Sequence, residues 1–285
     1  MEYKISADEL GSAFICDALR ALYKAYQKIG AELYVVGATA RDIGCLIMNI
    51  GPVPRKTCDL DVAVSLEDWK EYDKLSEVLL ETGFTKAPQK QRFSWHIEKA
   101  GFDMEIDVVP FGSIASGDSV AWPPDGNPQM SVKGFKEIMS HADTVIIDED
   151  LKIMVAPLSG QWFLKYDAWR DRHLRTTKDA ADMQFFLENA YVAYALASDT
   201  IPEDVSIEAD TFDLTVAGAE WIASDVSKVL SESNRLEYSS YLGDEVIAGV
   251  ESELLCDLYD KSLHSRFDSI RRALYRMSVI LRKQA

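Results

Sequence analysis

Apolar residues in the first 157 positions follow the spacings of short strands and of a few helices. Residues 7–29 repeat apolar side chains every three or four positions, which predicts an amphipathic helix that ends at Gly30. Residues 91–98 alternate apolar and polar side chains, as do residues 104–110, and the short turn between them predicts an antiparallel hairpin. Further strands are predicted at 32–36, 58–64 and within 130–156, and further helices at 38–48 and 65–81.

The pattern becomes helical from Leu158 onward. Helices are predicted at 158–173, from 178, and at 211–231, 236–260 and 264–283. We therefore expect two domains, 1–157 and 158–285, and an α+β fold in which a small mixed β-sheet flanked by helices precedes a C-terminal helical bundle. Residues 112–128 are rich in Gly, Ser, Pro and Asp, which predicts a long loop.

Composition is that of a globular protein: 47% of the 285 residues are hydrophobic and 27% are charged. Because no apolar run approaches the roughly 20 residues that cross a bilayer, we expect a cytoplasmic protein with no membrane partner. The net charge of −17 is concentrated in residues 179–260, which hold nineteen acidic and two basic residues. Such an acidic segment repels nucleic acid, whereas residues 261–285 carry a net charge of +6.

Two carboxylates, Asp59 and Asp61, stand one residue apart in an apolar run. In a strand both project from the same face, and their mutual repulsion favours a divalent cation with oxygen ligands. An isolated pattern of this kind is more often a strand end with two solvated acids. Its neighbours decide between the two interpretations.

Those neighbours are a glycine turn and a third acid. Residues 34–36 form a short apolar run that leads through Gly37 into a predicted helix, and such a turn lets the backbone approach a phosphate closely. The predicted strand at 104–110 carries Asp107, with Glu105 on the same face.

The order of these motifs resembles the nucleotidyltransferase superfamily with the DNA polymerase beta-like fold, over residues 30–180. The stretch 37–42 looks like the glycine–arginine–aspartate element of poly(A) polymerases and CCA-adding enzymes. Residues 163–172 and 178–182 look more like AbiEii-type nucleotidyltransferases of bacterial toxin–antitoxin systems. Ala38 stands where the family has Gly or Ser, so it offers no hydroxyl to a phosphate.

The resemblance implies a metal-dependent enzyme that moves a nucleoside monophosphate from an NTP, such as ATP, to a hydroxyl acceptor. Asp59, Asp61 and Asp107 would be its catalytic residues and the ligands of two Mg²⁺ or Mn²⁺ ions. The acceptor could be a tRNA 3′ end, a protein or a small molecule, and an antitoxin is a possible partner. A non-catalytic nucleotide- or partner-binding protein that retains the fold is the alternative.

The resemblance also implies a set of phosphate-binding residues: Gly37, Ala38, Arg41 and Lys165. Lys165 belongs to a basic cluster at 165–178, which could equally be a solvated face with ion pairs along the helix. We expect the helical domain to complete the nucleotide cleft, with Lys165 facing the sheet.

Overall fold

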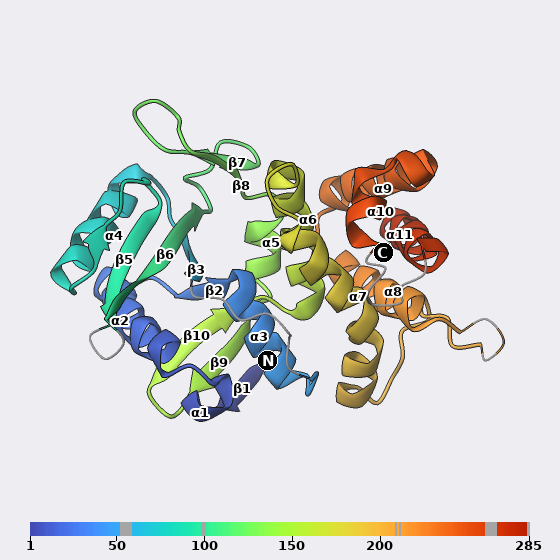
Figure 1. Ribbon diagram of the computed structural model, residues 1–285, viewed down its shortest axis with the longest axis horizontal. Coiled ribbons are helices and arrows are strands. Elements are labelled where there is room, and N and C mark those ends of the chain that lie inside the picture. The colour runs from blue at the N-terminus through green and yellow to red at the C-terminus, as the bar shows by residue number, and fades with distance from the viewer. Residues whose placement is uncertain (52–58, 98–100, 209, 211, 260–266, 284–285) are drawn as a thin grey trace. The chain divides into compact units, whose positions relative to one another are not determined.

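The structure is a computed structural model that describes residues 1–51, 59–97, 101–208, 210, 212–259 and 267–283. The chain forms two compact units, Met1–Pro157 and Leu158–Ala285, and each is described here by itself. Figure 1 shows strands and short helices in the first unit and helices in the second.

A mixed β-sheet is the centre of the first unit (Figure 1). Within the described residues it has eight strands in the order β1-β9-β10-β2-β3-β6-β5-β4. Strands β3 and β6 are parallel, and antiparallel β2 and β5 border them on either side. The strands of this sheet are β1 (Glu2–Ile5), β2 (Tyr34–Val36), β3 (Asp59–Ser65), β4 (Thr85–Lys86), β5 (Arg92–Ile97), β6 (Phe102–Phe111), β9 (Asp143–Ile147) and β10 (Leu151–Val155).

Alternation along β3 explains how one strand serves both the core and the acidic face. Leu60, Val62 and Val64 are fully buried, whereas Asp59 is exposed and Asp61 is half-buried. Since successive side chains of a strand point to opposite faces, the apolar set packs into the core and the two acids project from the other face. The hairpin predicted from residues 91–110 is confirmed, because β5 and β6 pair antiparallel.

Helices of the first unit begin and end at residues suited to these positions. Gly11, in the left-handed conformation, ends the first short helix, and Ser12 caps the next, so the single helix predicted at 7–29 is two. Helices α2 and α4 pack against each other, and α3 packs on β2 and β3. The helices are α1 (Ala7–Leu10), α2 (Ala13–Ile29), α3 (Gly37–Ile47), α4 (Trp69–Glu81) and α5 (Phe135–Met139).

Four short elements differ from the sequence prediction. The loop predicted at 112–128 contains β7 (Ser119–Ala121), which pairs with β8 (Gln129–Ser131) in a separate small sheet. Helix α5 interrupts the region predicted to hold only strands. Strands β1 and β4 were not predicted. Elements of two to five residues are too short for periodicity to reveal them.

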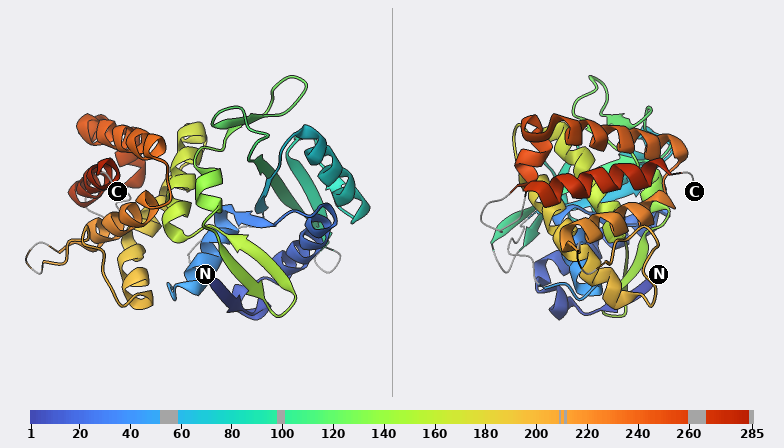
Figure 2. Two further views of the ribbon diagram at one scale, coloured as in Figure 1. Left: turned by 180° about the vertical axis from the view of Figure 1, so that it is seen from behind. Right: turned by 90° about the vertical axis from the view of Figure 1, so that its right-hand side faces the viewer.

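The second unit is a bundle of helices (Figure 2), and apolar side chains such as Trp162, Phe186 and Leu274 are buried within it. Helix α11 packs against α8 and α9, and α7 packs against α6 and α8. The helix predicted at 236–260 is instead two helices with a 3-10 turn between them. The helices are α6 (Leu158–Arg172), α7 (Lys178–Ala197), α8 (Leu214–Ser227), α9 (Glu232–Ala248), α10 (Glu253–Leu258) and α11 (Phe267–Arg282).

The α+β fold class predicted from the sequence is confirmed: a mixed sheet flanked by helices is followed by a helical region. No helix in the described ranges is long and apolar enough to cross a membrane. Some predicted details lie outside the described residues: the strand start at 58, the strand end at 98, the hairpin turn at 99–100, the helix end at 260 and the first residues of the helices predicted at 211 and 264.

Candidate functional site

Strand register places two of the three candidate acids, Asp61 and Asp107, in one row across the sheet. Asp61 of β3 is paired with Val36 of β2 on one side and with Asp107 of β6 on the other. Asp59 stands opposite Glu105 in the next row on the same face. The side chain of Asp107 is 18% exposed and Glu105 is 56% exposed. Two segments far apart in the sequence thus contribute four carboxylates to one face of two neighbouring strands.

The backbone of Gly37 lies directly against this face. Its φ is +68°, a conformation that residues with a Cβ rarely adopt, and a Cβ at this position would lie 2.1 Å from Oδ2 of Asp61. Helix α3 begins at Gly37, and the preceding Val36 provides no side-chain cap for its first N–H groups. The glycine therefore brings the start of a helix beside a carboxylate, at a distance that only a residue without a side chain permits.

Arg92 completes the row, and the sequence did not single it out. Its Nε and Nη2 donate to the two carboxylate oxygens of Asp107 at 2.8 and 2.9 Å, and its Nη1 donates to Glu105 at 2.6 Å. The hydrogen bonds to Asp107 raise the pKa of Arg92 above its ordinary value. The predicted hairpin was the available signal, but only the observed register pairs residue 92 with residue 107.

The donor chemistry of the acidic face fits a divalent cation. Carboxylate oxygens are the ligands that Mg²⁺ and Mn²⁺ prefer, and Asp59 and Asp61 offer them from one strand. Asp107 belongs to the same face but is engaged by Arg92. In the part of the chain that the structure describes, no three His, Cys, Asp or Glu side chains are grouped closely enough to hold a metal ion.

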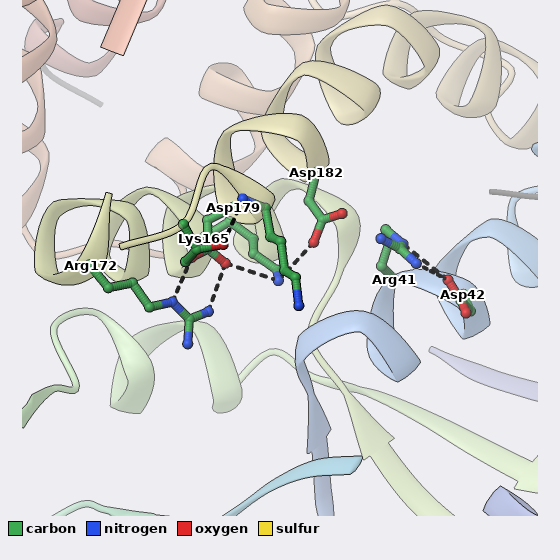
Figure 3. Close-up of polar contacts among 8 residues, drawn as sticks. Arg41, Asp42, Lys165, Arg172, Asp179 and Asp182 are labelled. Carbon is green, nitrogen blue, oxygen red and sulfur yellow. Dashed lines mark hydrogen bonds and ion pairs between the residues drawn. The ribbon is translucent and has the colours of Figure 1, made fainter. Parts of the chain in front are cut away.

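Ala38 and Arg41 lie in the first turns of α3 and are both buried. The guanidinium of Arg41 donates to Oδ1 of Asp42, at 2.7 Å from Nη2 (Figure 3). The side chain of Arg41 is 1% exposed, so it is part of the packing of α3. A role in phosphate binding stays a prediction for both residues.

Lys165 lies within an ion-pair cluster of the helical unit (Figure 3). Its Nζ is 3.2 Å from Oδ1 of Asp179 and 2.8 Å from Oδ2 of Asp182, both on α7. Arg172 donates hydrogen bonds from Nε and Nη2 to the carboxylate oxygens of Asp179 at 2.7 and 2.8 Å. The sequence suggested a solvated or a phosphate-binding cluster; the observed Lys165 is buried and joins α6 to α7.

Burial and charge oppose each other at Asp179, which is fully buried. Burial raises the pKa of its carboxyl, but hydrogen bonds from Arg172 and the charges of Lys165 and Arg172 outweigh burial, so the pKa is lowered overall. The carboxylate form is therefore the one that the folded helical unit stabilises.

No family model matches the chain, and no curated protein matches it either. Solved structures with a similar arrangement include ANT(2'')-Ia in complex with adenylyl-2''-tobramycin, with 14% identity, a TM-score of 0.34, and coverage of 64% of this chain and 88% of that one. A nucleotidyltransferase-like protein from Paracoccidioides brasiliensis has 18% identity, a TM-score of 0.42 and coverage of 79% and 93%. The Thermotoga maritima CCA-adding enzyme complexed with tRNA has 13% identity, a TM-score of 0.33 and coverage of 93% and 70%.

Proposed function

We propose that this protein is a metal-dependent nucleotidyltransferase that moves a nucleoside monophosphate from an NTP to a hydroxyl group. The observation that carries the proposal is the row formed by Asp61 and Asp107 on adjacent parallel strands, with the Gly37 backbone against Asp61. Carboxylates that share one face of a sheet beside the start of a helix combine a cation site with an anion site. An NTP escorted by a divalent cation needs both.

Each residue has a distinct part in the proposal. Asp59 and Asp61 would hold the cation, with Asp107 as a third ligand; when bound, the cation offsets charge on the triphosphate and on the departing pyrophosphate. Gly37 and Ala38 would bring backbone N–H groups to the phosphates. Because the backbone of Gly37 lies against Asp61, we expect these donors to need little rearrangement when the nucleotide binds.

Arg41 and Lys165 complete the proposed phosphate-binding set. To bind phosphate, Arg41 would have to exchange its contact with Asp42, and Lys165 its contacts with Asp179 and Asp182. Since a buried cation deprived of its partner is costly, we expect the backbone of α3 to contribute more to phosphate affinity than either side chain.

The non-catalytic alternative rests on a specific contact. Arg92 neutralises Asp107, so the third carboxylate is already satisfied without a cation. Under this alternative the protein binds an NTP or a partner through the same face but releases no pyrophosphate. If the protein is an enzyme, the acceptor could be an RNA 3′ end, a protein, which includes an antitoxin partner, or a small molecule.

The test is transfer of label from each α-labelled NTP in the presence of Mg²⁺ and a cell extract. We expect one acceptor to become labelled with release of pyrophosphate, and we expect Asp59→Asn and Asp61→Asn to abolish both. The labelled product identifies the acceptor. Because the two substitutions relieve repulsion between carboxylates, they should leave the melting temperature close to that of the wild type.

Asp103→Asn is the matched control. It removes a carboxylate from the same strand as Asp107, but Asp103 is exposed and contacts His96 instead of the acidic row. It should transfer label at the wild-type rate. Transfer that survives in the Asp59 and Asp61 variants contradicts the proposal, and Mg²⁺-dependent NTP binding without pyrophosphate release establishes the alternative.

A further inference from the structure

Arg92 places a positive charge beside Asp107, the carboxylate proposed as the third ligand of the cation. Register pairs it directly with Asp107, and the two parallel N–H groups of its guanidinium meet both oxygens of that carboxylate. A bidentate pair of this kind combines charge with fixed geometry: it occupies one lone pair on each oxygen of Asp107 and holds a positive charge beside the carboxylate, which repels a second cation. The arginine and a cation therefore cannot both hold Asp107 in this way.

The same arginine has a second acceptor outside the pair. Glu105 is two residues from Asp107 on the same face, and it accepts from the remaining terminal nitrogen of Arg92. The side chain of Glu105 is 56% exposed and that of Arg92 is 24% exposed, so the arginine is at the border of the sheet face and not inside the core. Arg92 can leave Asp107 and keep an ionic partner.

We propose that Arg92 competes with divalent cation for Asp107, so that Asp107 joins a cation held by Asp59 and Asp61 only when Arg92 turns towards Glu105. This inference rests on the proposed function, because it takes Asp59 and Asp61 as cation ligands. Arg92 acts through Asp107 and touches neither nucleotide nor acceptor, which makes it a positioning residue. Because of this competition, the cation binds to all three carboxylates only at a higher concentration than binding to Asp59 and Asp61 requires.

The test counts Mn²⁺ bound to the full chain without nucleotide, by isothermal titration and by the electron paramagnetic resonance signal of free Mn²⁺. In the wild type we expect binding at Asp59 and Asp61, with Asp107 recruited only weakly. Arg92→Gln removes the competing charge but keeps a polar side chain of similar length. It should strengthen the binding that depends on Asp107 by about tenfold or more, the scale of one charge-assisted contact.

Two further variants guard against a trivial result. Arg20→Gln removes the same charge from the same unit, where Arg20 pairs with Asp148 and Asp150 and not with the acidic face, so it should bind Mn²⁺ as the wild type does. Arg92→Lys keeps the charge that supports folding but loses the forked geometry. We expect its Mn²⁺ affinity to lie between those of the wild type and Arg92→Gln.

Thermal unfolding gives a second readout. With chelator present, Arg92→Gln should melt below the wild type, because Asp107 and Glu105 lose their counter-charge; with Mn²⁺ present, its melting temperature should rise more than that of the wild type. In the double variant Arg92→Gln/Asp107→Asn the additional Mn²⁺ affinity should disappear.

The outcomes separate this inference from the function on which it rests. If Arg92→Gln melts lower but binds Mn²⁺ as the wild type does, the pair is structural only and the inference is wrong, whereas nucleotide transfer by the wild type can still stand. If the wild type binds no Mn²⁺ and Asp59→Asn changes nothing, both fail. Stronger Mn²⁺ binding in Arg92→Gln, together with its loss in the double variant, supports the inference even where no acceptor has been found.

Discussion

Gly37 is the residue at which backbone conformation and the candidate site depend on each other most directly. Gly37→Ala places a Cβ 2.1 Å from Oδ2 and 2.9 Å from Cγ of Asp61, at a φ of +68°. We expect it to lower the free energy of unfolding by about 1–3 kcal/mol and to weaken Mg²⁺-dependent nucleotide binding, because Asp61 must move away. Urea unfolding and nucleotide titration measure the two effects.

Gly30→Ala is a control that separates the cost of backbone strain from the cost of a steric contact with Asp61. Gly30 has a similar φ of +74°, but a Cβ there would meet nothing within 4 Å. The variant should therefore lose only the stability that the left-handed backbone costs, about 1 kcal/mol, and bind nucleotide as the wild type does. Equal nucleotide affinities in the Gly37 and Gly30 variants would argue against a site at the start of α3.

Sequence alone located the acids but not their partner. Alternation within one strand shows that Asp59 and Asp61 share a face, and the resemblance to a known superfamily singled out Asp107. The pairing of Arg92 with Asp107 depends on the register between two strands, and a shift of one residue would move the arginine to the other face. The burial of Arg41 and Lys165 was equally invisible, since each reads as an ordinary charged position on a helix.

Helices α6 and α7 are joined by buried charge, which gives the helical unit a defined response to acid. The lowered pKa of Asp179 means that the folded unit holds its carboxylate in the ionised form. Asp179→Asn should cost roughly 3 kcal/mol at pH 7, because Lys165 and Arg172 lose a fully buried partner. Chemical unfolding of both proteins measures this difference.

The pH dependence follows from the direction of that shift. An unfolded Asp titrates near a pKa of about 3.9, and the folded group titrates below that value. The stability that Asp179 supplies is therefore complete above the unfolded pKa and is lost as the pH falls through the folded one. The difference between wild type and Asp179→Asn should shrink over this acidic range. Asp244→Asn, at an exposed position of α9, should change stability little at any pH.

Helices α7 and α8 meet at a glycine. A Cβ on Gly218 would lie 2.3 Å from the carbonyl oxygen of Leu187, which is backbone and cannot rotate away. Gly218→Ala should separate the two helices and cost about 1–3 kcal/mol, as overpacking does. Gly243→Ala in α9, where a Cβ meets nothing within 4 Å, should instead stabilise the protein by up to about 1 kcal/mol. Equal changes in the urea midpoint of unfolding in the Gly218 and Gly243 variants would contradict a close approach of α7 and α8 at Gly218.

At the scale of elements, most long periodic patterns were predicted, although the helices predicted at 7–29 and 236–260 are each divided in two, and several of the shortest elements were missed. The apolar stripe of residues 267–282 and the alternation of residues 92–97 each identify an element, because several turns or residues repeat one rule. Strand β7 has three residues, and its partner β8 is needed to recognise it as a strand. Pairing across a loop is tertiary information, which composition does not contain.

At the scale of the whole molecule, charge is distributed along the sequence more unevenly than apolar character is. The acidic residues 179–260 belong to the helical unit, whereas the candidate cation ligands belong to the sheet unit. The fold class could be predicted because strands precede helices along the chain. The order of strands in the sheet could not, since β9 and β10 lie between β1 and β2.

That strand order has a consequence for folding of the protein during its synthesis on the ribosome. Strand β1 pairs with β9, whose residues follow it by about 140 positions. At a synthesis rate of about 5–20 residues per second, the partner of β1 is made roughly 7–30 s after β1 itself. Domains of this size commonly fold within milliseconds to seconds once their chain is complete. The time at which β1 can pair with β9 is therefore set by translation and not by the conformational search of the chain.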